Sequence, residues 1–203
     1  MPELLDHAAA IAHLRAADPT MGAVIDRIGP LEAKWPPMSP FEALVRSIVY
    51  QQLATAAAAT IHRRLVALMP DGTPTPGVML ALDDEELRSA GLSRQKMAYL
   101  RSLALSVQDG SVSLRQLPEM GDEAVIQALT RVKGIGRWSA EIFLMSVLER
   151  PDVLASADVG LLAAVQKAYG LEKRPTPSEF LAMGQLWRPW RTVACLYLWR
   201  SLR

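Results

Sequence analysis

The chain has 203 residues, of which 50% are hydrophobic and 21% are charged, and its formal net charge at pH 7 is +1. This composition excludes a disordered chain and is typical of a globular protein with one core, or with two lobes that share one. The single cysteine, Cys195, excludes an intramolecular disulfide framework. The N-terminus does not have the pattern of a signal peptide, and no window has the roughly 18 uncharged apolar residues of a membrane span. We therefore expect a soluble protein of a reducing compartment.

Helical patterns dominate the chain, and alternating strand patterns are absent. Capping or helix-opening residues precede the apolar runs, in chain order at Ser39–Pro40, Thr55, Asp83, Ser93, Asp122, Val159 and Thr176–Pro177, and "PWRTVACLYLW" supplies the last helix. The acidic run at residues 83–86 stands where the helix dipole favours carboxylates. The sequence predicts an all-α protein of about ten helices.

Two proline-rich stretches, at residues 35–40 and 70–77, are predicted as loops. We expect residues 1–203 to fold as a single unit with two lobes. The first lobe is a central helical bundle at about residues 40–150, and the second combines residues 1–39 with residues 151–203.

The stretch "LTRVKGIGRWSAEIFLM", residues 129–145, interrupts an amphipathic helical pattern with Gly134 and Gly136. Glycine adopts positive φ angles that other residues avoid, so we expect a tight turn between two helices, a hairpin at about residues 122–149. Backbone N–H groups at such a helix start can bind a phosphate. A lone Gly-x-Gly is also common in ordinary helix connections, and this alternative stays open here.

Asp158, in "VLASADVGLLAAVQ", stands at the expected N-cap of a helix. An aspartate there is usually only a cap, but the small residues 155–157 before it leave room for a bulky group beside its carboxylate. Trp138 directly follows the glycine turn and therefore lies at the rim of the predicted phosphate site. Residues 184–203 contain four arginines and no acidic residue, which indicates a locally basic segment.

Taken together, these segments resemble the helix-hairpin-helix DNA glycosylase superfamily. The hairpin stretch and "SADVGL" occur between "SPFEALVRSIVYQQLA" and "WRPWRTVACLYLW", and the resemblance covers roughly residues 39–201. The closest branch is that of the 3-methyladenine DNA glycosylases II, which repair alkylated bases. The resemblance implies a two-lobed helical glycosylase fold, and the short helical N-terminus leads us to expect no N-terminal β-domain.

The resemblance also implies roles for individual residues. Asp158 falls on the family's catalytic aspartate, and Trp138 stands where strand-cutting relatives carry a lysine, so we expect a monofunctional enzyme. Trp138, Trp199 and Ile142, the last in place of a pocket tyrosine, would form the base pocket. The residues expected to contact DNA are Lys133, Gly134, Gly136, Arg137, Gln52, Leu53 and Arg188, of which Gln52 or Leu53 would fill the gap left by a flipped base.

The resemblance further implies that the carbonyl groups of Thr130, Val132 and Ile135 hold a structural Na⁺ or K⁺. The cysteine ligands of an iron–sulfur cluster are missing, and no other cofactor is expected. The predicted partner is double-stranded DNA that contains alkylated bases, with no membrane. The predicted protein is a monomer of the cytoplasm, or of the nucleus if it is eukaryotic.

Two alternatives remain at this point. The first is a helix-hairpin-helix module that binds the DNA backbone without catalysis, against which Asp158 and the terminal "WRPWR" argue. The second is a lyase-competent glycosylase for oxidised bases, which Trp138 disfavours because an indole cannot perform amine chemistry.

Overall fold

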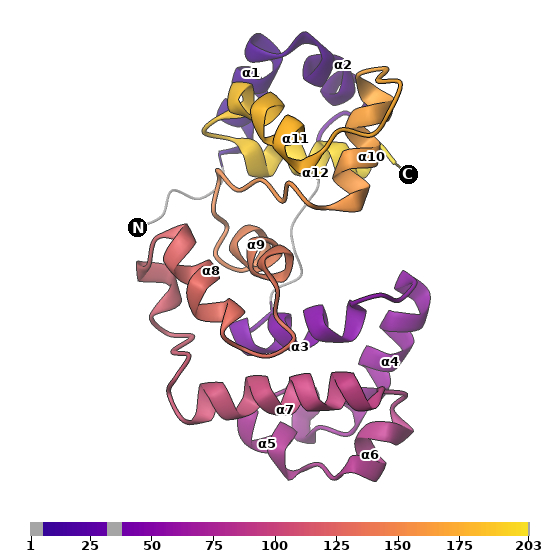
Figure 1. The fold of residues 1–203 in the computed structure, drawn as a ribbon, viewed down its shortest axis with the longest axis vertical. Helices are drawn as coiled ribbons and strands as arrows, with labels where there is room; N and C mark the ends of the chain where they lie inside the picture. The colour runs from indigo at the N-terminus through magenta and orange to yellow at the C-terminus, as the bar shows by residue number, and fades with distance from the viewer. Residues whose placement is uncertain (1–5, 32–37, 203) are drawn as a thin grey trace. The chain divides into compact units, whose positions relative to one another are not determined.

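The structure is a computed structural model that describes residues 6–31 and 38–202. Within these ranges the chain forms helices and turns and no β-strand, so the all-α prediction is confirmed (Figure 1). The α-helices are α1 (His7–Ala17), α2 (Pro19–Ile28), α3 (Pro40–Tyr50), α4 (Thr55–Ala67), α5 (Pro76–Ala81), α6 (Asp84–Ser89), α7 (Arg94–Gln108), α8 (Asp122–Thr130), α9 (Arg137–Ser146), α10 (Val159–Ala168), α11 (Pro177–Met183) and α12 (Arg191–Arg200). Three short 3₁₀ turns lie at Pro70–Gly72, Leu117–Glu119 and Gly184–Trp187.

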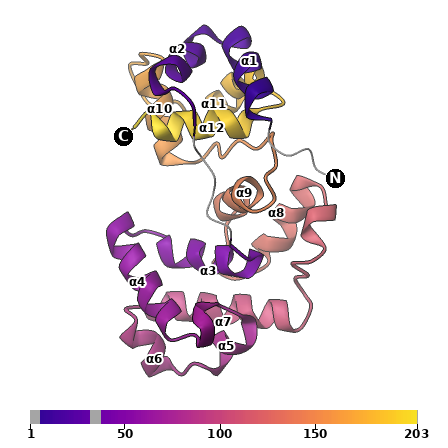
Figure 2. The ribbon, with the colours of Figure 1, turned by 180° about the vertical axis from the view of Figure 1, so that it is seen from behind.

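The helices group into two compact units. The middle unit is Pro37–Phe143, and the terminal unit combines Met1–Pro36 with Leu144–Arg203, so the division falls within α9. In the middle unit, α7 packs against α3, α5 and α6 (Figures 1 and 2). In the terminal unit, α12 packs against α1, α2 and α10. No helix in the described part of the chain is long and apolar enough to cross a membrane.

Most helices start where the local sequence predicts. The Ser39 hydroxyl accepts the Glu42 N–H at 3.2 Å, and Ser93 caps α7 in the same way. Asp83 and Thr176 each form a reciprocal capping box with the glutamate three residues later. The structure confirms these predicted helix starts. They could be predicted because a capping side chain bonds backbone N–H groups only two or three residues away.

Two local predictions were wrong. Thr55, which the sequence predicts as the cap of α4, is instead its first residue, and Ala54 occupies the N-cap position. The stretch 70–77, predicted as a loop, contains a 3₁₀ turn and the start of α5, because the Thr75 hydroxyl accepts the Val78 N–H and Pro76 takes the first turn. The other predicted loop, residues 35–40, lies partly outside the described residues.

A buried carboxylate joins three segments of the terminal unit. Asp18 is 6% exposed, ends α1 and caps α2 by accepting the N–H groups of Thr20 and Met21. Its other oxygen accepts the Tyr169 hydroxyl at 2.5 Å and the Trp187 indole N–H at 2.8 Å. Burial alone would raise the pKa of Asp18, but these four donors outweigh it and hold the pKa below its ordinary value of 3.8.

Asp18→Asn is expected to lower the free energy of unfolding by about 1–3 kcal/mol at pH 7, because the asparagine amide opposes one of the buried donors. The lowered pKa means that the native state favours the ionised carboxylate, so this difference is complete well above the ordinary value of 3.8 and shrinks as the pH falls through 3.8 towards the lower native pKa. Urea unfolding of both proteins across this pH range measures it. Asp6→Asn, at the exposed cap of α1, is the control and should change little. If the difference in free energy of unfolding between wild type and Asp18→Asn stayed constant down to about pH 2, the ionised Asp18 carboxylate would not be its source.

Candidate nucleic-acid interface and active site

The predicted glycine turn joins α8 to α9 in the middle unit. Gly134 has a φ of +94°, in the left-handed region, and a Cβ atom there would overlap the ring of Tyr99 on α7. Gly134 therefore has to be glycine for two independent reasons. Gly136 differs from the prediction, since its φ is not positive. A Cβ atom at Gly136 would meet no atom of the described residues within 4 Å.

The start of α9 has the features of an anion site. The Gly136 carbonyl accepts the Ala140 N–H at 3.1 Å, which begins the hydrogen-bond ladder of α9. The N–H groups of a helix's first turn have no partner four residues earlier, and the helix dipole is positive there. The open space at Gly136 and the exposed Lys133 lie on this turn. Phosphate binding by this turn stays a prediction.

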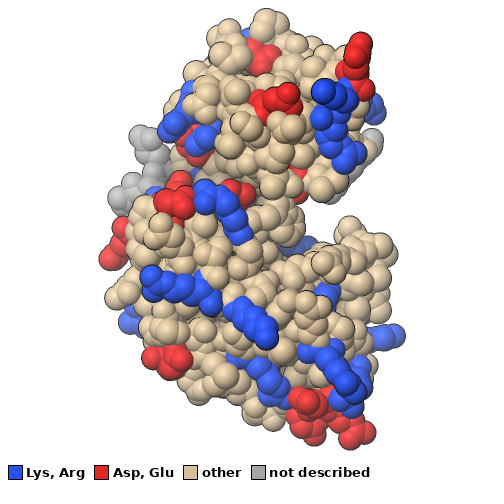
Figure 3. All heavy atoms as spheres, in the orientation of Figure 1, with Lys and Arg blue, Asp and Glu red and all other residues tan. Residues whose placement is uncertain are grey.

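A hollow of about 540 Å³ lies beside the turn in the middle unit. Three segments line most of it: residues 51–53 after α3, residues 91–99 around the start of α7, and residues 134–136 of the turn. On the face drawn in Figure 3, Lys and Arg side chains form several groups over the middle unit. The nearly neutral net charge of the chain therefore coexists with local positive groups.

The loop at residues 51–54, which we call the plug loop, follows α3. Gln52 has a φ of +56°, and the Leu53 side chain is exposed although it is apolar. The Gln51 amide donates to the Gly134 carbonyl at 2.8 Å, and Lys96 Nζ donates to the carbonyl groups of Val49 at 2.5 Å and Gln51 at 2.8 Å. Burial lowers the pKa of the Lys96 ammonium. The plug loop is thus tied both to α7 and to the glycine turn.

Arg137, predicted to contact phosphate, is held by two carboxylates. Its guanidinium donates to both oxygens of Glu123, at 3.1 and 2.8 Å, and to Glu141 at 3.1 Å. Burial raises the pKa of Glu141 more than Arg137 lowers it, and the hydrogen bond to Glu123 raises the pKa of Arg137. Its side chain is still 59% exposed. A phosphate contact from Arg137 stays a prediction, and it would have to compete with these carboxylates.

Asp158 lies in the terminal unit as the N-cap of α10. Its Oδ1 accepts the Leu161 N–H at 2.7 Å and the Trp199 indole N–H at 2.9 Å. A Cβ atom on Gly160 would lie 3.1 Å from the same oxygen and 3.6 Å from the Trp199 ring. Trp199 and Gly160 therefore fix where the Asp158 carboxylate lies, one by donating a hydrogen bond and the other by lacking a side chain.

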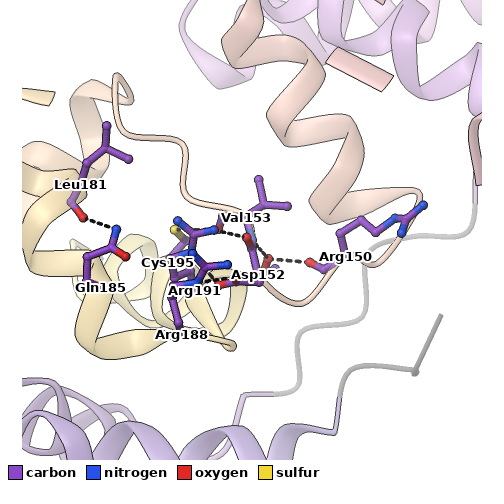
Figure 4. Close-up of polar contacts among 9 residues, drawn as sticks. Arg150, Asp152, Val153, Leu181, Gln185, Arg188, Arg191 and Cys195 are labelled. Atoms are coloured by element: carbon purple, nitrogen blue, oxygen red, sulfur yellow. Dashed lines mark hydrogen bonds and ion pairs between the residues drawn. The ribbon is translucent and has the colours of Figure 1, made fainter. Parts of the chain in front are cut away.

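Asp152, which lies outside the predicted basic segment at residues 184–203, balances part of the positive charge of that segment. Asp152 forms an ion pair with Arg188, with 3.0 Å between Nε and Oδ2, and accepts a hydrogen bond from Arg191 Nε at 2.6 Å (Figure 4). Arg191 also donates to the Asp152 carbonyl at 2.6 Å. Arg191 is largely covered, whereas the Arg188 side chain is 57% exposed. A DNA contact from Arg188 stays a prediction, with part of its charge already balanced.

The three predicted pocket residues lie on two helices. Trp138, which is 39% exposed, and the half-buried Ile142 lie one turn apart on α9 in the middle unit. Trp199 lies on α12 in the terminal unit. The base pocket expected from these three residues stays a prediction.

The predicted cation site remains untested. The Val132 carbonyl already accepts the Ile135 N–H at 3.0 Å, and the Thr130 hydroxyl bonds the Ile126 carbonyl at 2.8 Å. Among residues 6–31 and 38–202, no three His, Cys, Asp or Glu side chains are grouped as metal ligands would be.

Four residues that shape these sites were not predicted from the sequence: Gln51, Lys96, Tyr99 and Gly160. Gln51 and Gly134 are 83 residues apart in the chain, so no local pattern connects them. Gly160 did leave a signal, because a glycine in the first turn of a helix lowers helix stability and needs a reason.

The fold and these sites define an all-α protein of the helix-hairpin-helix class, with an aspartate-capped helix after the hairpin. Residues 45–191 match the HhH-GPD superfamily of base excision DNA repair proteins. The chain belongs to this superfamily, which confirms the family predicted from the sequence.

Named relatives point to the alkylation-repair branch. The YfjP protein of Bacillus subtilis is 34% identical over 170 residues, which are 81% of this chain and 59% of that protein, so the chain spans less than two thirds of its length. DNA-3-methyladenine glycosylase 1 of Schizosaccharomyces pombe is 34% identical over 164 residues, covering 80% of this chain and 72% of that protein. The solved structure of the S. pombe 3-methyladenine DNA glycosylase with abasic DNA has a TM-score of 0.89 at 30% identity and covers 94% of this chain and 95% of that one.

Proposed function

We propose that the protein is a DNA glycosylase that hydrolyses the N-glycosidic bond of alkylated purines, such as 3-methyladenine and 7-methylguanine, in double-stranded DNA. The observation that carries the proposal is the Asp158 carboxylate, oriented at the start of α10 by the Leu161 and Trp199 N–H groups. The names of the S. pombe relatives support the same substrate class.

The proposed reaction starts with rotation of the damaged nucleotide out of the duplex, because its base cannot be reached inside the stack. Alkylation at a ring nitrogen makes the purine cationic, so the C1′–N bond breaks with its electron pair moving to the base. The sugar is left with oxocarbenium character, which the ionised Asp158 stabilises. Water then adds its oxygen to C1′ and loses a proton to solvent, which leaves an abasic site.

Base selection in this proposal depends on aromatic side chains. Trp138 and Trp199 would bind a cationic base by stacking and cation–π attraction, worth about 0.5–2 kcal/mol each. Trp138 also supports a monofunctional enzyme, because strand-cutting members of the family carry a lysine amine at this position and an indole cannot form a Schiff base. We further propose that the protein acts as a monomer. We also propose that it lies in the compartment that holds the DNA, which is the cytoplasm or, in a eukaryote, the nucleus.

The protein is expected to release 3-methyladenine and 7-methylguanine from a methylated duplex and to leave alkali-labile abasic sites with no strand break before alkali. Chromatography of the released bases and gel analysis of the DNA measure both results. Borohydride added during the reaction should trap no covalent adduct. Binding without release would favour the non-catalytic hairpin module, and a trapped adduct would favour the lyase alternative.

A further inference from the structure

We propose that Lys96 is a positioning residue that holds the plug loop, residues 51–54, in the conformation that enters the duplex. The inference rests on the proposed function, since it assigns a device for base flipping to the same enzyme. All the residues involved belong to the middle unit, and the proposal implies that α7 contributes to the recognition of damaged bases.

The first support is the pair of hydrogen bonds at the end of α3. Lys96, in the first turn of α7, donates from Nζ to the carbonyl groups of Val49 and Gln51, at 2.5 and 2.8 Å. The last carbonyl groups of a helix lack partners within the helix, and a cation is favoured at that end of the dipole. Lys96 thus fixes the direction in which the chain leaves α3, one residue before Gln52 turns to a φ of +56°.

The second support is the connection of Gln51 to the hairpin turn. The backbone of Gln51 is held by Lys96, while its side-chain amide donates to the Gly134 carbonyl at 2.8 Å. Tyr99, three residues after Lys96 on α7, lies directly against Gly134. One face of α7 therefore supports both the plug loop and the turn predicted to grip the damaged strand.

The third support is the weak packing of the plug loop itself. Gln52, Leu53 and Ala54 are exposed, and the loop borders the hollow of about 540 Å³, so burial contributes little to holding it. An apolar side chain such as Leu53, held outward on a fixed backbone, suits insertion into a base stack. Fixing a loop in its bound conformation lowers the entropy cost of binding, which is the advantage that Lys96 supplies.

Lys96→Met removes both hydrogen bonds and leaves an unbranched side chain that is one heavy atom shorter. Single-turnover release of 7-methylguanine paired with cytosine should fall about ten- to hundredfold, the range for hydrogen bonds from a charged donor. Affinity for undamaged duplex should stay within about twofold. The same lesion opposite an abasic site needs no unpairing, so its release should largely recover. Lys173→Met, at an exposed lysine of the terminal unit, is the control and should behave as wild type.

A purely structural role predicts another pattern. If Lys96→Met slows the paired and unpaired lesions by the same factor, or weakens binding to undamaged DNA equally, the proposal is overturned. Lys96→Arg retains a cationic donor and should restore part of the selective loss. If Lys96→Met does not fold, Lys96→Gln shortens the side chain and removes its positive charge, and it should give the same selective defect. Normal release by Lys96→Gln would overturn the proposal.

A second measurement is independent of base release. The fluorescence of 2-aminopurine placed opposite an abasic-site analogue rises when a side chain enters the gap and unstacks it. Lys96→Met should give a smaller rise than wild type at saturating protein. If wild type releases no base, the proposed function fails, and this measurement still decides the role of Lys96, since an undiminished rise would contradict it.

Discussion

Asp158→Asn is expected to reduce single-turnover base release by about 10²–10³-fold while leaving a folded protein that binds DNA. The oxocarbenium-like sugar would lose the negative charge beside it. The cap should survive, because the Leu161 N–H and the Trp199 indole N–H both bond to one oxygen, and the asparagine carbonyl can accept both. Base release and thermal melting are measured on the same preparation.

The control for this variant is Asp83→Asn, at the N-cap of α6, where one carboxylate oxygen likewise accepts two N–H groups, both from the backbone. It should change neither release nor DNA binding, so it separates the loss of a capping charge from the loss of the catalytic one. Near-normal release by Asp158→Asn would remove Asp158 from the active site. The protein would then be a DNA-binding hairpin protein whose reaction does not use Asp158.

Gly134→Ala is expected to lower the free energy of unfolding by about 2–5 kcal/mol, the sum of a left-handed alanine and an overpacked contact. The positive φ and the Tyr99 ring oppose the new methyl group independently. Movement of the turn should also remove most of the affinity for duplex DNA. Urea unfolding and DNA titration of the folded fraction measure the two effects.

Gly136→Ala is the matched control two residues away. Its φ is ordinary and no described atom lies within 4 Å of the new methyl, so stability should change by less than about 1 kcal/mol. DNA affinity should nevertheless fall, because the methyl would occupy the space through which a phosphate approaches the start of α9. If Gly134→Ala and Gly136→Ala lose stability equally, the contact with Tyr99 is not what makes Gly134 necessary.

Local chemistry made much of the fold predictable. A cap and its first-turn partner are three residues apart, so Ser39, Asp83, Ser93 and Thr176 could be identified from neighbouring residues. The glycine turn was also visible, since a break in helical periodicity needs no knowledge of the rest of the chain. The exception at residues 70–77 shows the limit, because proline both starts helices and populates loops.

Charge was harder to predict than helix position. The sequence suggested that Arg188 belongs to an acid-free segment, but Asp152, 36 positions earlier in numbering, pairs with it and with Arg191. Arg137 likewise meets Glu123 from the preceding helix. An ion pair depends on which segments fold together, so the free charge available to a phosphate cannot be counted along the chain.

The sequence by itself determined the all-α class, most helix starts, the glycine turn and the N-cap position of Asp158, because each depends on residues within one or two turns of each other. Only the tertiary structure decided that Tyr99 underlies Gly134, that Lys96 and Gln51 hold the plug loop, and that Trp199 orients Asp158. These contacts join residues that are 35 or more positions apart. Such contacts depend on how whole helices pack, which no short-range pattern encodes.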